Sequence, residues 1–303
     1  MKNILLVAGL LVSSLILAQT VGPPPLAPEV KKLLEDGEKL FSAGKHDDAL
    51  RMLSEGMEKY PQSRLQLLSV RMNAYEHLGR WAEAAADAIE KDRLDHKKTS
   101  VFALEVAYDY MKLGDLDNAF RWLDVSAERG FQNYYVFDKV DDYKPLRGDP
   151  RLAALVKRFK INAGIGQPVK PFSRRDLNGR EISPASFRGK VLLIDFWATW
   201  CGPCVKEIPG LKKCYDDLHG RGFEVIGISL DQDRVKLETF VRENQIQWPV
   251  TCSFKGFWDD DVRALYGVQL IPSVWLVDKK GNLRHLGLRG EALQMAVAEM
   301  LNE

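Results

Sequence analysis

Apolar residues follow two different patterns along this chain. Residues 151–160 carry apolar side chains at helical spacing, and most of the chain before them is helical in character. Beyond residue 190, short apolar runs such as 191–197 alternate with helical patterns, and runs of this length between turn residues indicate buried strands. The pattern therefore predicts an all-helical first part followed by an α/β second part.

The second part divides into alternating strands and helices. We expect strands at 191–197, 223–229, 249–252, 273–278 and 283–287, and helices at 202–218, 233–244, 259–266 and 290–302. Residues 279–282 make the last turn between strands. Such alternation builds a central sheet with helices on both faces, and a sheet of this kind places its functional site at the carboxyl ends of its strands.

The first part contains an internal repeat of 35 residues. Glycines stand at this interval, and small or apolar residues follow each glycine at matching positions. These residues are Gly44, Gly79 and Gly114, then Ala49, Ala84 and Ala119, then Leu53, Ala88 and Leu123. A glycine that ends one helix, followed by a small residue where two helices touch, is typical of stacked helix pairs.

The repeat resembles the tetratricopeptide repeat, although only the first unit closes with the expected proline, at Pro61. The resemblance implies a solenoid whose concave surface takes a protein partner. The alternative is that the stacked pairs serve only to fold stably. The Pro, Gly and Asp residues of 138–155 predict short helices that cap the solenoid, and 151–160 predicts a last amphipathic helix.

The first residues have the composition of a secretory leader. Lys2 precedes an apolar segment at 4–17, and a proline cluster follows at 23–25. We expect a signal peptide at 1–18, cleaved after Ala18. An uncleaved membrane anchor is the alternative, because Ile16 is not the small residue preferred three positions before the cut. Either outcome places the protein outside the cytoplasm, in the periplasm or secreted.

These features give a domain plan and exclude one class of partner. We predict a signal peptide at 1–18, a proline-rich mature start at 19–28, a helical repeat domain at 29–160 and an α/β domain at 161–303. The formal net charge is +1, and the charges are interspersed without a basic stripe. The sequence therefore does not predict a nucleic-acid partner.

A pair of cysteines directly follows the 191–197 strand. Cys201 and Cys204 enclose Gly202 and Pro203 at the start of the helix predicted for 202–218. Cysteines at this spacing on the first turn of a helix can close a disulfide and reopen it without refolding. The free N–H groups and the helix dipole favour a thiolate at Cys201, the predicted nucleophile. Cys204, one turn deeper, is the predicted resolving thiol.

The remaining cysteines argue against the alternative of a zinc site. Zinc needs a second close pair of Cys or His ligands, but Cys214 and Cys252 are isolated and the five histidines are scattered. We therefore predict no metal. Cys214 and Cys252 are expected to be small core residues, and a disulfide between them in an oxidising compartment is the alternative.

Residues 195–204 resemble the active-site stretch of thioredoxins, and a wider set of motifs resembles the extracytoplasmic TlpA/ResA-like branch. These motifs lie at 165–168, 176–180, 187–190, 206–209, 225–229, 266–268, 271–273 and 277–281. The resemblance covers about 164–303. It implies a thioredoxin-like fold with a mixed central sheet, and a thiol-disulfide oxidoreductase that uses the Cys201–Cys204 pair without a cofactor.

The resemblance also implies roles for two acids. Asp195 stands inside an apolar strand, where a carboxyl group is costly, and matches the buried aspartate that accepts a proton from the resolving cysteine of thioredoxins. The alternative is an aspartate turned towards solvent. Glu207 follows Cys204 by one turn and matches the active-site glutamate of ResA-like proteins. For Glu207, a solvated helix acid is the alternative.

The client-binding residues are predicted in the same way. Pro272 matches the cis-proline of the fold, which leaves the backbone of Ile271 free to pair with an extended peptide. Trp200 should flank the sulfurs, Gly202 should permit close approach of another chain, and Pro203 suits the first turn of the helix.

Two classes of function fit these features. In the first, the protein reduces disulfides of client proteins, takes electrons from a membrane thiol donor, and recruits client or donor through its repeats. In the second, it is a repeat-based interaction protein whose redox domain is a docking module. The dipeptide Gly202–Pro203 favours a reductant over an oxidase. A thiol peroxidase is disfavoured, because Ala198 stands where peroxiredoxins carry Thr or Ser.

Overall fold

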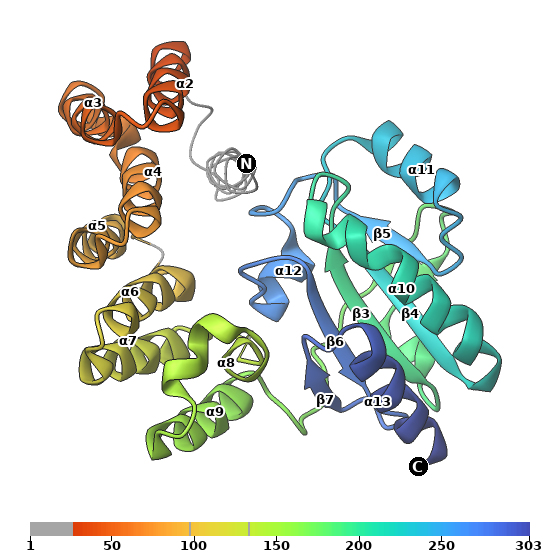
Figure 1. Cartoon of the computed structure of the whole chain (residues 1–303). Helices are drawn as coiled ribbons and strands as arrows, with labels where there is room; N and C mark the ends of the chain where they lie inside the picture. Colours follow the sequence, from red (N-terminus) through yellow and green to blue (C-terminus); the bar gives the residue numbers. More distant parts are fainter. Residues whose placement is uncertain (1–26, 97, 133) are drawn as a thin grey trace. The chain divides into compact units, whose positions relative to one another are not determined.

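The computed structural model describes residues 27–96, 98–132 and 134–303 (Figure 1). The predicted signal peptide and nearly all of the proline-rich start lie outside the described residues. The described chain forms two compact units. One holds the residues up to Arg129 together with Asp141–Leu155, and the other holds Gly130–Val140 together with Val156–Glu303. No helix in these ranges has the length and apolar content needed to cross a membrane.

The first unit is a stack of helix pairs. Its helices are α2 (Pro28–Ser42), α3 (His46–Lys59), α4 (Arg64–His77), α5 (Trp81–Leu94), α6 (Ser100–Lys112) and α7 (Leu116–Glu128), with short 3-10 turns at Pro61–Ser63 and Asp141–Leu146. Each helix packs against the next along the chain. The prediction of a helical first part is confirmed.

The 35-residue interval corresponds to one helix pair. Gly44, Gly79 and Gly114 adopt positive φ at the turns that end α2, α4 and α6, a conformation that side chains resist. Five residues after each glycine, Ala49, Ala84 and Ala119 are almost fully buried. The small residues therefore lie where neighbouring helices meet, as the repeat pattern predicted.

Residues 136–162 span both the cap predicted at 138–155 and the last helix predicted at 151–160. They form the short helix α8 (Val136–Lys139), the turn Asp141–Leu146 and the longer helix α9 (Pro150–Asn162). Phe131, Phe137 and Phe159 form a buried aromatic cluster with ring centroids 5.5 to 6.3 Å apart. All three residues belong to the second unit. That unit therefore includes chain that lies before residue 161 in the sequence.

The second unit is built on a five-stranded mixed sheet. Its strands are β3 (Val191–Trp197), β4 (Phe223–Ser229), β5 (Val250–Cys252), β6 (Ser273–Val277) and β7 (Leu283–Leu286), in the order β5-β4-β3-β6-β7. β3, β4 and β5 are parallel, whereas β6 and β7 are antiparallel to their neighbours. A separate hairpin joins β1 (Arg174–Arg175) and β2 (Glu181–Ile182). This arrangement confirms the predicted thioredoxin-like fold class.

Helices cover both faces of the sheet, so β3 is buried along its whole length. The helices are α10 (Gly202–Leu218), α11 (Arg234–Glu243), α12 (Asp261–Tyr266) and α13 (Gly290–Asn302). Leu193 and Trp197 pack towards α10 and α13, whereas Ile194 and Phe196 pack towards α12. Because side chains alternate along a strand, Asp195 lies on the α10 and α13 side.

Candidate active site

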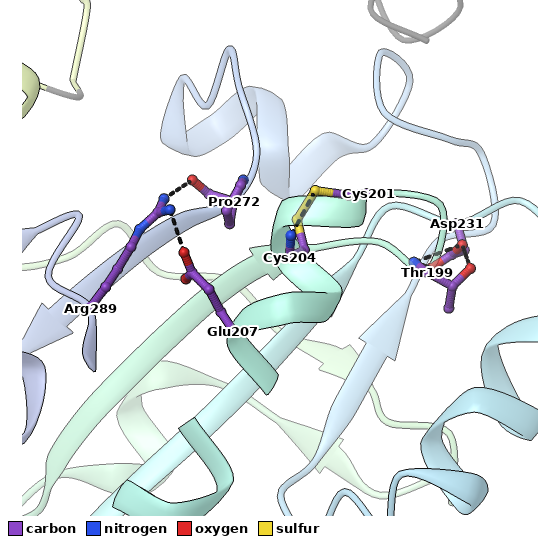
Figure 2. Close-up of a disulfide and its surroundings, with 7 residues drawn as sticks. All are labelled: Thr199, Cys201, Cys204, Glu207, Asp231, Pro272 and Arg289. Carbon is purple, nitrogen blue, oxygen red and sulfur yellow. Dashed lines mark hydrogen bonds and ion pairs between the residues drawn. A yellow bond between two sulfur atoms is a disulfide. The ribbon is translucent and has the colours of Figure 1, made fainter. Parts of the chain in front are cut away.

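The two sulfurs lie at the first turn of α10. Cys201 and Cys204 form a disulfide with a Cα–Cα distance of 5.2 Å (Figure 2). Cys201 is the N-cap residue, and the backbone N–H of Cys204 points to its Sγ at 3.3 Å. An N–H donor aimed at this sulfur stabilises negative charge on it when the disulfide opens. Both cysteines are buried in the oxidised state.

The loop before Cys201 is fastened to the end of β4. The backbone N–H of Thr199 donates to Asp231 Oδ2 at 3.0 Å, and its hydroxyl donates to Oδ1 at 2.6 Å (Figure 2). Ser229 also donates its hydroxyl to Asp231 Oδ2, at 2.7 Å. The buried Asp231 carboxylate therefore holds the loop in position. Sequence reasoning missed this residue, although an acid just past the carboxyl end of a strand was a usable signal.

Asp195 and Cys204 line one cavity of about 220 Å³. The Asp195 side chain is almost fully buried and has no hydrogen-bond or ion-pair partner among the described residues. Burial, the largest cause, and the nearby Glu207 together raise the pKa of Asp195 to about 7, against an opposing effect of Arg289. A carboxyl group in this state can accept or release a proton near neutral pH.

Glu207, on the next turn of α10, lines the same cavity and forms an ion pair with Arg289. Its side chain is one-third exposed, so it is neither a fully solvated helix acid nor a buried one. Burial raises the pKa of Glu207, and Arg289 lowers it. Arg289 also donates to the carbonyl of Pro272 at 2.9 Å (Figure 2). Arg289 was not predicted as a site residue, because nothing near it in the sequence signals its partners.

Of the predicted client-binding residues, Pro272 lines the cavity with Asp195 and Cys204. The Ile271–Pro272 peptide bond is cis, and both residues are half-buried. Gly202 and Pro203 are exposed at the start of α10, and no atom lies within 4 Å of a Cβ built on Gly202. Trp200 is 39% exposed, an unusual exposure for a large aromatic residue. The site therefore offers an accessible, partly apolar surface beside a buried disulfide.

The other cysteines lie away from this chemistry. Cys214 and Cys252 are free thiols, and Cys214 belongs to the core between the sheet and α10. Burial raises the pKa of Cys214 to about 11. Within the described ranges, no group of three or more His, Cys, Asp or Glu is placed to hold a metal ion. Trp197 is buried in the same core as Cys214 and packs against the ring of Phe240.

Comparison with known proteins gives the family. Residues 165–286 match the AhpC/TSA family. The thiol-disulfide oxidoreductase ResA of Bacillus thuringiensis subsp. konkukian is 30% identical over 139 residues, which are 46% of this chain and 78% of that protein. The chain belongs to the ResA family of thiol-disulfide oxidoreductases. The predicted enzyme class and the predicted family resemblance are therefore confirmed.

Further relatives match a similar share of this ResA-family protein. ResA of Bacillus subtilis is 26% identical over 124 residues, 41% of this chain and 67% of that protein. Among solved structures, the thioredoxin domain of a thiol-disulfide oxidoreductase from Bacteroides vulgatus is 30% identical, with a TM-score of 0.42, and covers 46% of this chain and 98% of that chain. In this ResA-family chain, Cys201 and Cys204 are the two cysteines that form a disulfide.

Proposed function

We propose that this ResA-family protein works outside the cytoplasm as a protein disulfide reductase. Cys201 is the nucleophile, Cys204 is the resolving thiol, and Asp195 is the main proton acceptor, with Glu207 assisting. The observation that carries the proposal is the placement of an unpartnered, buried carboxyl group in one cavity with the resolving sulfur. Such a group is suited to take a proton from a buried thiol.

The reaction balances as two exchanges. The Cys201 thiolate attacks one sulfur of the client disulfide, forms a mixed disulfide, and releases the other client sulfur as a thiolate. The Cys204 thiol then passes its proton to Asp195, and the resulting thiolate attacks Cys201 Sγ. This step closes the Cys201–Cys204 disulfide and releases the second client thiolate. Two electrons have passed to the client, and a thiol donor restores the dithiol.

Reduction of insulin with dithiothreitol as donor tests this activity. We expect the wild-type protein to accelerate precipitation of the insulin B chain, and Cys201→Ser to lose at least about 100-fold of that activity, because its hydroxyl cannot replace the thiolate. Cys214→Ser is the matched control, since it also removes one buried sulfur. Equal activity in wild type and Cys201→Ser would support the alternative, a docking module without redox turnover.

The direction of electron flow is proposed from the dipeptide between the cysteines. Gly202 and Pro203 form the thioredoxin dipeptide, and thioredoxin lies at about −270 mV against about −120 mV for the oxidant DsbA. We therefore expect the Cys201–Cys204 couple to equilibrate with glutathione nearer the first value. A potential above about −150 mV would make the protein an oxidant.

We also propose that the helix pairs recruit the client protein or a membrane thiol donor, and that residues 1–18 direct export. The helix pairs stack as solenoid repeats do, and such stacks commonly offer a binding surface. A Cys204→Ser variant should trap clients on Cys201 as mixed disulfides. A full-length trap should capture native clients faster than a trap that begins at Gly130, since binding raises local concentration. Equal rates would leave the repeats as a spacer.

A further inference from the structure

One guanidinium group joins two functional elements of the site. Arg289 precedes α13, and its Nη1 donates to Glu207 Oε1 at 2.5 Å while its Nη2 donates to the Pro272 carbonyl at 2.9 Å (Figure 2). Glu207 belongs to α10, the helix that carries both cysteines, whereas Pro272 precedes β6. The redox helix and the proline loop are therefore held together through a single side chain.

A tyrosine from outside the α/β sequence region packs on this arginine. The ring centroid of Tyr135 lies 5.7 Å from Arg289 Cζ, within the range of a cation–π contact. Tyr135 is also pressed against Gly287, because a Cβ added there would come within 1.9 Å of the tyrosine ring. Its segment, Gly130–Val140, belongs to the same compact unit as the redox site. Gln132 anchors that segment by donating to the Tyr266 carbonyl at 2.8 Å.

We propose that Arg289, held by Tyr135, is a positioning residue of the redox site that fixes Glu207 and the Pro272 loop in one geometry. The inference rests on the proposed function, since it assigns a residue that acts through the proton-accepting carboxyl groups. It also makes the segment before residue 161 a working part of the redox unit.

Charge around the cavity explains how this residue acts on proton transfer. The titratable and charged groups that line the cavity with Asp195 are Cys204, Lys206 and Glu207 of α10 and Arg289 at the start of α13. Burial raises the pKa of both acids, and Arg289 lowers both. Without the guanidinium, each carboxyl group keeps its proton to a higher pH. A smaller fraction of Asp195 and Glu207 is then ionised at neutral pH and able to accept the proton of Cys204.

The pH dependence of resolution tests the proposal in the full-length protein. Reduced protein is mixed with oxidised glutathione, samples are quenched with acid, and the decay of the mixed disulfide is followed by mass between about pH 5 and pH 9. We expect Arg289→Gln to move the midpoint of the rate profile up by about one pH unit and to slow decay about five- to tenfold near pH 6.5. The rates should converge at high pH.

Two further variants test separately the charge of Arg289 and the contact of Tyr135 with it. Arg289→Lys retains the charge and should restore most of the wild-type midpoint. Tyr135→Leu should shift the midpoint in the same direction as Arg289→Gln, by a smaller amount. The matched controls are Arg284→Gln, which removes an arginine paired with Glu303, and Tyr134→Leu, which alters the adjacent ring. Neither control should shift the profile.

The outcomes separate this inference from the proposed function. A uniform loss of rate at every pH in Arg289→Gln, or a profile of Tyr135→Leu that matches wild type, would overturn the positioning role. Wild-type protein that never forms a mixed disulfide with glutathione would overturn the proposed function, and the positioning role with it.

Discussion

The carboxyl group of Asp195 and the sulfur of Cys204 line the same cavity, on the face of the sheet that α10 and α13 cover. Asp195 is 5% exposed, and burial raises its pKa to about 7. This raised pKa should affect both the rate at which mixed disulfides are resolved and the pH dependence of folding stability. The two effects can be measured separately.

We predict that Asp195→Asn resolves mixed disulfides at least about tenfold more slowly at neutral pH, because an amide cannot accept the Cys204 proton. The rate should recover as the pH approaches the range where the thiol ionises without help. Quenched-flow measurement of the glutathione mixed disulfide checks this. Unchanged kinetics at neutral pH would transfer the role to Glu207 or to water.

The same substitution should change how stability depends on pH. The pKa of Asp195 is raised in the folded state, so its contribution is fully present below about pH 4 and is lost as the pH rises towards about 7. That loss amounts to roughly 4 kcal/mol at most. Urea unfolding of oxidised Asp195→Asn should therefore show a flatter pH dependence than wild type between these limits. Parallel curves for the two proteins would contradict the raised pKa.

A second buried acid makes the repeat unit sensitive to pH. Asp109 on α6 is fully buried, and neither of its carboxyl oxygens has a hydrogen-bond partner in the described structure. Burial, the largest cause, and the nearby acids Glu76 and Glu105 raise its pKa to about 8, against an opposing effect of Lys91. The raised pKa means that stability is lost as the pH rises from about 4 to about 8.

We predict that Asp109→Asn stabilises the repeat unit at pH 8 by roughly 2 kcal/mol or more relative to its effect at pH 5, since the variant never ionises there. Thermal unfolding at both pH values measures this difference. Asp47→Asn is the matched control, because Asp47 is 94% exposed. A gain that is equal at both pH values would mean that Asp109 is already ionised in the folded protein at pH 5, and would contradict the raised pKa.

The number of free thiols in the protein can be measured directly. Cys214 and Cys252 are unpaired in the structure, so unreduced protein that is denatured should release two thiols to Ellman's reagent, and reduced protein should release four. In native reduced protein at pH 8, Cys214 should label far more slowly than Cys201, because burial raises the pKa of Cys214 to about 11. No thiol in the unreduced, denatured protein would indicate the alternative disulfide.

Much of the fold followed from local patterns in the sequence. The apolar run of β3, the glycine interval of the helix pairs and the cysteine spacing each depend on neighbours in the chain, and the elements built on them lie within about two residues of their predicted bounds. The burial of Asp195 also followed, since a lone acid among apolar strand residues has few other places to go. These signals are short-range, and a sequence displays them directly.

The parts that were missed depend on contacts between distant residues. Arg289 meets Glu207 across 82 residues, and Thr199 meets Asp231 across 32. No periodicity or spacing links such pairs, because each contact is made by the folded sheet. The segment around Tyr135 falls within the helical repeat domain predicted at 29–160, whereas its contacts group it with the redox unit.

Because Gly130–Val140 groups with the redox unit, a shortened chain should need this segment to fold stably. A chain that begins at Ala163 lacks Gly130–Val140, and so loses the hydrogen bond from Gln132 to Tyr266 and the packing of Tyr134 against the core around α12. We therefore expect it to unfold at a lower temperature than a chain that begins at Gly130, by several degrees. Circular dichroism during heating measures both.

The two shortened chains should also differ in chemistry. Each contains Cys201, Cys204 and Asp195, so each should reduce oxidised glutathione at high pH. At about pH 6.5, the chain from Ala163 should resolve the mixed disulfide more slowly, as Tyr135→Leu does in the full-length protein, because Arg289 has lost the ring that holds it. The chain from Gly130 should match the full-length protein. Equal unfolding temperatures and equal pH profiles for the two chains would mean that the redox unit begins near residue 161, and that Gly130–Val140 only connects it to the repeats.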